Sequence, residues 1–179
     1  MHLRTKKYIE NNKKGLLISI NVLEFVSVII NYAAAITVLN QEKHTDDPFP
    51  VLLDMADNTA CIRWTNHACK DSLAGRALGR FLCMLLVNTN LGINAKWLST
   101  DENLIADTIS RLQDSPDKAK KFFDYSKLKQ QFPQLAPCRA FLPSPELRSL
   151  IWDCVLHAKS PNPQQVKEMI RDGLGKLTS

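Results

Sequence analysis

The feature that most restricts the fold is a long apolar run near the N-terminus, "LLISINVLEFVSVIINYAAAITVL", residues 16–39. Its apolar residues recur at i, i+3, i+4, i+7, i+8 and i+11, which predicts a helix over 22–38 that is buried on most sides. Three polar residues fall three and four positions apart and form one narrow stripe: Glu24, Ser27 and Asn31. We therefore expect Glu24 to lie beside another polar group.

The same run imitates a signal peptide or a membrane anchor, because five basic residues precede it: Arg4, Lys6, Lys7, Lys13 and Lys14. An acid near the centre of a bilayer costs about 2.5–3.5 kcal/mol, so Glu24 argues against a membrane partner. Five cysteines without a CxxC pair favour a reducing compartment, cytoplasmic or nuclear, with the cysteines as apolar filler in helices. A membrane-anchored or secreted protein is the alternative.

Beyond this run, local patterns predict an α/β fold. The apolar "VLLDMAD" at 51–57 has the length of a buried strand, and Asn58 or Asp57 can cap the helix that follows. A helix over 72–88 turns apolar residues inward: Leu73, Ala77, Leu78, Phe81, Leu82 and Leu85. Residues 91–98 alternate as a strand does, and Ser99 with Glu102 forms a capping box before another helix. Helix, strand, helix, helix, strand, helix implies a parallel pair of strands.

A boundary is expected near Asp114, because seven of the nine prolines lie from Pro116 to Pro163. Two helices are predicted beyond it. Ser144 with Pro145 begins the first, Asn162 with Pro163 begins the second, and Gly173 ends the second. We therefore divide the chain into a basic segment 1–14, an α/β domain 15–113 and a proline-rich linker with a mostly helical tail, 114–179.

Three acids are candidates for a shared site. Ligands of parallel sheets gather at the carboxyl ends of strands, and Asp57 falls at such an end. Glu24 from one helix and Asp107 from another are expected to converge on it, whereas Asp54 is merely nearby.

Three motifs in this order resemble the ribonuclease H domain that follows reverse transcriptase in retroelement polyproteins, from Gly15 to Leu112. "ISINVLEFVSVI" is similar to the segment leading into the family's first helix, whose glutamate, the second catalytic acid, corresponds to Glu24. "MADNTACIRW" resembles "TDNTAAV", whose aspartate is the third acid and corresponds to Asp57. "NLIADTISRL" is similar to "N-x-x-A-D-x-L-S-R", whose aspartate is the fourth acid and corresponds to Asp107.

The resemblance implies hydrolysis of the RNA strand of RNA–DNA hybrids with Mg²⁺ or Mn²⁺ as cofactor, held by Glu24, Asp57 and Asp107. Two such cations about 3.5–4 Å apart stabilise the attacking and leaving oxygens of an in-line displacement. Hard cations of this kind prefer carboxylate ligands. The rest of a retroelement polyprotein is an implied partner, and the tail resembles the segment that joins ribonuclease H to the next polyprotein domain in retroelements of the tyrosine-recombinase kind.

The chain departs from the family where the first acid belongs. That acid lies on a strand upstream of "NVLE", and here "MHLRTKKYIENNKK" is basic and polar, with Glu10 as its sole acid. We expect a partial ribonuclease H-like fold with its first strands missing and with weak or no activity. An exposed apolar helix and sheet edge are expected to need a partner or to aggregate.

Contacts to nucleic acid are predicted on a basic face of Lys70, Arg76 and Arg80, since phosphates are recognised electrostatically and the chain carries a net charge of +5. A solvated helix face is the alternative. Trp64 and Trp97 are expected in the core, and His67 has no predicted role. A non-catalytic remnant that binds nucleic acid or protein is the alternative function.

Overall fold

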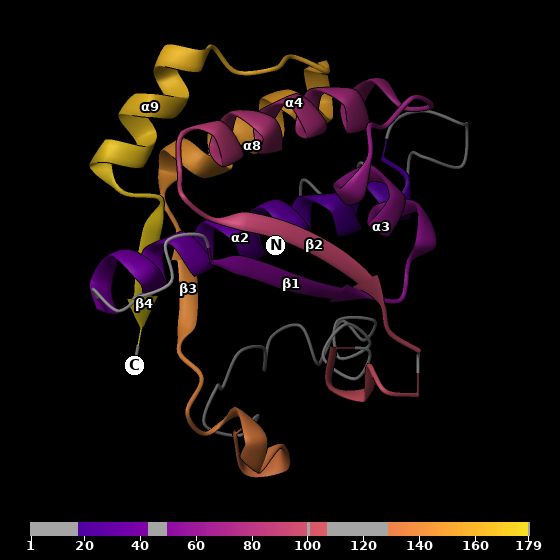
Figure 1. Ribbon diagram of the computed structural model, residues 1–179, viewed down its shortest axis with the longest axis vertical. Helices are drawn as coiled ribbons and strands as arrows, with labels where there is room; N and C mark the ends of the chain where they lie inside the picture. The colour runs from indigo at the N-terminus through magenta and orange to yellow at the C-terminus, as the bar shows by residue number, and fades with distance from the viewer. Residues whose placement is uncertain (1–17, 43–49, 100, 107–128, 179) are drawn as a thin grey trace, which may run out of the picture.

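The structure of the chain is a computed structural model that describes residues 18–42, 50–99, 101–106 and 129–178. Its first half contains α2 (Ile20–Glu42), β1 (Val51–Ala56), α3 (Thr59–Asn66), α4 (Leu73–Val87) and β2 (Gly92–Trp97). The 3-10 helix η2 (Pro133–Leu135) precedes β3 (Ala140–Pro143), α8 (Pro145–His157), α9 (Pro163–Asp172) and β4 (Gly175–Thr178). The first five elements follow the predicted order (Figure 1).

Strands β1 and β2 form the predicted parallel pair, in register from Val51 beside Gly92 to Ala56 beside Trp97. Helices α3 and α4 connect them, so this half of the chain is α/β. Figure 1 shows the pair in front of α2, with α3 towards one end of it. α2 packs against β1, and α3 packs mainly against β2. Both helices therefore cover the same face of the two-stranded sheet.

Helix α2 contacts more elements than its neighbours do, because it packs on α3, α4, β1, β3 and β4. Six of its side chains are at most 2% exposed: Val22, Phe25, Val28, Ile29, Tyr32 and Ala33. The Phe25 ring meets Trp64 edge to face at 5.8 Å, which confirms the expected core position of Trp64. The expectation of an exposed apolar helix is wrong, since α4, β3 and β4 supply the cover that upstream strands would otherwise give.

By length and composition alone, the stretch Ile20–Gln41 of α2 is also apolar enough to cross a membrane, and 39% of its 18-residue apolar window is buried inside the molecule. Core helices of soluble proteins and signal sequences have the same character. An intracellular location therefore stays a prediction.

The outward face of β1 corrects the prediction of a buried strand. Val51, Leu53 and Met55 are 63%, 50% and 44% exposed, and Asp54 on the opposite face is buried. A strand of a parallel sheet is normally covered on both faces, but among the described residues helices pack on one face of this pair. Trp97 at the end of β2 is 60% exposed, so its expected core position is also wrong.

Helix α4 begins at the N-cap Ser72, whose hydroxyl accepts a hydrogen bond from the Gly75 amide at 3.1 Å. The predicted inward residues are buried except Leu73, which is 66% exposed because it is the first residue of the helix. Three cysteines are buried as predicted, Cys61, Cys69 and Cys154, whereas Cys83 and Cys138 are exposed.

Residues 129–178 pack onto the same hydrophobic core as the first half, with α8 and α9 against α4. The predicted caps are confirmed, because Ser144 accepts from Leu147 at 3.1 Å and Asn162 forms a capping box with Gln165. Strands β3 and β4 pair antiparallel and were not predicted. The proposed boundary at Asp114 lies outside the described residues.

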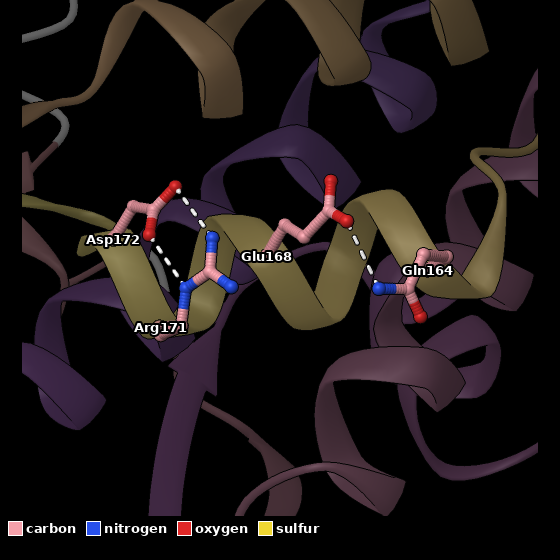
Figure 2. Close-up of polar contacts among 4 residues, drawn as sticks. All are labelled: Gln164, Glu168, Arg171 and Asp172. Carbon is pink, nitrogen blue, oxygen red and sulfur yellow. Dashed lines mark hydrogen bonds and ion pairs between the residues drawn. The ribbon is translucent and has the colours of Figure 1, made fainter.

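The outer face of α9 is polar. Gln164 donates to Glu168 at 2.9 Å, and Arg171 pairs with Asp172 at 2.8 Å (Figure 2). Val166 and Met169 on the other face are buried in the core. The helix is therefore amphipathic, with its charges in solvent, where each pair adds little stability.

Two glycines of α4 give a prediction for the packing. A methyl group at Gly75 would lie 2.6 Å from the Cys69 sulfur and 3.2 Å from Trp64, whereas one at Gly79 would lie 4.0 Å from Phe25. We expect Gly75→Ala to destabilise the fold by about 1–3 kcal/mol through overpacking. Gly79→Ala should stabilise it by about 0.5–1 kcal/mol through helix propensity. Chemical denaturation of both variants measures this, and equal effects at the two positions would contradict the packing.

Candidate metal site at the end of the first strand

The turn after β1 presents two polar side chains in different ways. Asn58 is the N-cap of α3, and its Oδ1 accepts from the amides of Ala60 at 2.9 Å and Cys61 at 3.1 Å. Of the two predicted caps, Asn58 is therefore the one used. Asp57 is left exposed at the carboxyl end of β1, where it is available to a ligand.

Glu24 lies beside polar groups of this turn, as predicted. Asn58 Nδ2 donates to Asn21 Oδ1 at 2.8 Å, and the Asn58 side chain also lies near enough to the Glu24 carboxylate to favour its charged form. Further along α2, Asn31 Nδ2 donates to Asp54 Oδ1 at 3.1 Å. One side of α2 therefore forms hydrogen bonds both to β1 and to the turn that follows β1.

Asp57 lies close enough to Glu24 for its negative charge to act on the Glu24 carboxyl group. The pKa of Glu24 is raised, first by burial and second by the negative charge of Asp57, while the nearby Asn58 side chain opposes the rise. Two carboxylates that repel each other in this way attract a cation, which would relieve both the repulsion and the cost of burial. The convergence of the predicted acids stays a prediction, to which this electrostatic effect of Asp57 on Glu24 is favourable.

Asp54, which was expected only to lie near the site, is hydrogen-bonded to α2. It is 7% exposed and lies on the inward face of β1, where the Asn31 amide compensates its burial. With burial as the larger cause, the charges of Asp54 and Glu24 help raise the pKa of Cys61 to about 12. Cys61 is therefore a neutral thiol at physiological pH and is not an effective metal ligand in this state.

The third predicted acid, Asp107, lies outside the described residues. The segment before it begins as predicted, because Ser99 Oγ donates to Glu102 at 2.7 Å and the Glu102 amide bonds back to Ser99 Oγ at 3.3 Å. Residues 104–106 are helical. Among the described residues, no group of three His, Cys, Asp or Glu side chains could hold a metal ion.

The donors that do meet are suited to Mg²⁺ or Mn²⁺. Glu24 and Asp57 offer carboxylate oxygens, as hard cations prefer. Mg²⁺ in proteins is commonly held by one or two carboxylates, with water and substrate phosphates completing its octahedron. Two carboxylates are therefore suited to a cation that binds weakly and whose coordination is completed by water and by the phosphates of a substrate.

The predicted nucleic-acid contacts lie on other elements. Arg76 and Arg80 are exposed on α4, and Lys70 is exposed in the loop before it. His67 is the exposed C-cap of α3, at the opposite end of that helix from Asn58. The structure thus keeps the three basic residues accessible without joining them to the acids.

Two features of the site were not predicted from the sequence: the presence of Asn21, and the contact of Asn58 with α2 in addition to its role as N-cap. The bond between these two residues joins two segments far apart in the sequence, and each alone reads as a common helix-terminus residue. The available signal was spacing, since Asn21 precedes Glu24 by one helical turn and thus shares its stripe. Searches of protein-family models, curated proteins and solved structures found no match to the chain.

The raised pKa of Glu24 gives a prediction with a definite sign. A carboxyl group whose folded pKa is raised stabilises the fold fully below its unfolded pKa, and this stability is lost as pH rises through the folded value. We expect Glu24→Gln to raise the melting temperature at pH 7 in metal-free buffer, with no gain at pH 4 or below. Thermal unfolding against pH measures this. A gain that grows on acidification would contradict the environment described for Glu24.

Proposed function

We propose that the chain is a retroelement-derived ribonuclease H-like domain that acts on the RNA strand of RNA–DNA hybrids with Mg²⁺ or Mn²⁺. Glu24 and Asp57 are the proposed metal ligands among the described residues, and Asp107 is the third. One observation supports the proposal: the charge of Asp57, at the end of β1, helps raise the pKa of Glu24 on α2, and Asn58 beside Asp57 bonds Asn21, one helical turn before Glu24. Glu24 and Asp57 are two of the positions at which the family resemblance puts catalytic acids.

The geometry supports hydrolysis of a phosphodiester over other metal chemistry. A cation held by two carboxylates keeps most of its coordination sites for water and phosphate oxygens, which are the reacting groups of such a hydrolysis. Asp57 is exposed, so a bulky nucleic acid can approach it. Glu24 is half-buried, which limits its mobility and fixes one side of the site.

The proposed activity is low. The family's first acid, which commonly bridges both metals, has no counterpart among the described residues, in which no three-ligand group is found. Each missing carboxylate removes charge that would balance a dication and one of the contacts that orient it. We therefore expect weak metal binding and slow cleavage, more readily seen with Mn²⁺ than with Mg²⁺.

The second candidate is a non-catalytic domain that binds nucleic acid. It is favoured by the exposed Arg76 and Arg80, one turn apart on α4, which can contact phosphates without any metal. This function would leave Glu24 and Asp57 without a part in the activity. The two candidates differ in whether a cation and the acids are needed.

A cleavage assay tests the proposed function. Wild type with Mn²⁺ and a hybrid labelled on its RNA strand should release short RNA, and Asp57→Asn should lower the rate at least about 100-fold through loss of a metal ligand. Asp71→Asn, which changes an exposed acid in the loop between α3 and α4, is the matched control and should keep the wild-type rate. No cleavage by wild type, or equal cleavage by both variants, would refute it.

A binding assay tests the second candidate. Arg76→Ala with Arg80→Ala should weaken hybrid binding in EDTA and lower the slope of log affinity against log salt by about 1–2, because two phosphate contacts are lost. Arg148→Ala with Arg171→Ala, which removes exposed arginines of α8 and α9, controls for net charge. The same loss in both double variants would show that binding has no preferred face.

A further inference from the structure

Asn58 joins three elements through one side chain. Its Oδ1 accepts two backbone amides of α3, from Ala60 and Cys61. Its Nδ2 donates to Asn21 of α2 at 2.8 Å, and Asn21 lies one helical turn before Glu24. It follows Asp57 directly in the chain, so it fixes the turn that carries this acid as well.

We propose that Asn58 is a positioning residue that sets the separation of the Glu24 and Asp57 carboxylates. This inference rests on the proposed function in one respect, namely that the two acids bind a divalent cation. Asn58 is not itself a proposed ligand: its oxygen is used by the α3 amides, and its amide nitrogen is a donor only.

The position of this bond explains why it controls geometry. α2 is held to β1 and its following turn at two places, by Asn21 with Asn58 at its first turn and by Asn31 with Asp54 further along. Apolar packing alone fixes the distance between a helix and a sheet better than it fixes rotation of the helix about its axis, because packing is not directional. Two directional hydrogen bonds fix that rotation, and Glu24 lies between them in the sequence.

Substitutions can separate the hydrogen bond between Asn58 and Asn21, which we call the clamp, from the role of Asn58 as N-cap of α3. Asn58→Ser keeps an N-cap acceptor, because serine is about as good a cap as asparagine, but removes the donor to α2. Asn21→Ala removes the other end of the same bond. Asn66→Ala is the matched control, since Asn66 also ties α3 to another element, bonding the Ala95 carbonyl at 2.7 Å and the Ala95 amide at 2.9 Å, away from both acids.

The first measurement is Mn²⁺ affinity by isothermal titration calorimetry on the full chain. Partners that orient metal ligands typically affect affinity 10–100-fold. We expect Asn58→Ser and Asn21→Ala each to weaken Mn²⁺ binding by about 10-fold or more, and the double variant to be no weaker than the poorer single one. Asn66→Ala should lower the melting temperature by about 2–4 °C and leave the affinity unchanged.

The second measurement needs no metal. The thermal unfolding of wild type, the two single variants and the double variant is compared in EDTA, and a shared bond predicts that their losses of melting temperature do not add. If the wild type binds no Mn²⁺, the proposed function is refuted. The thermal unfolding of the four proteins then decides by itself whether Asn58 and Asn21 act through a shared bond. Additive losses, or unchanged Mn²⁺ affinity in Asn58→Ser when wild type binds, would overturn the inference.

Discussion

Burial of one side of α2 is the constraint on which the rest of the structure depends. Phe25, Ile29 and Tyr32 are fully buried, and each such side chain contributes about 1.5–3 kcal/mol. The Tyr32 hydroxyl also bonds Thr89 and the Leu91 carbonyl, which ties α2 to the start of β2. With the apolar side held by α3, α4, β3 and β4, the polar stripe of α2 lies beside β1 at Asn31, is exposed at Ser27, and places Glu24 near the turn after β1.

The position of the site follows from the polar side chains that α2 carries beside its buried apolar side. Asn21 and Glu24 are half-buried at the start of α2, and buried polar groups need partners from the protein, whereas Asn31 is exposed and adds a bond to β1. Asn58 and Asp54 supply those partners, and Asp57 adds a second charge beside Glu24. Burial first and the charge of Asp57 second raise the pKa of Glu24 and lower stability at neutral pH, a cost that a bound cation would offset.

Local features were predictable from the sequence, and features that depend on distant cover were not. The cap at Asn58, the strand 51–56 and the inward residues of α4 follow from spacing and from short-range hydrogen bonds. The exposed face of β1 could not be predicted in this way, because "VLLDMA" has apolar residues on both sides and nothing local indicates which side lacks a neighbour. The strands β3 and β4 were missed since each is four residues long and is stabilised by pairing across two helices.

The most direct test of convergence is paramagnetic broadening of amide NMR signals by Mn²⁺ at substoichiometric concentration. The account predicts that residues 21–25 of α2 and residues 57–60 after β1 broaden together, while β3 and the exposed acids Asp71 and Glu146 remain sharp. Broadening of only one of the two segments, or equal broadening at every exposed acid, would contradict a shared site for Glu24 and Asp57.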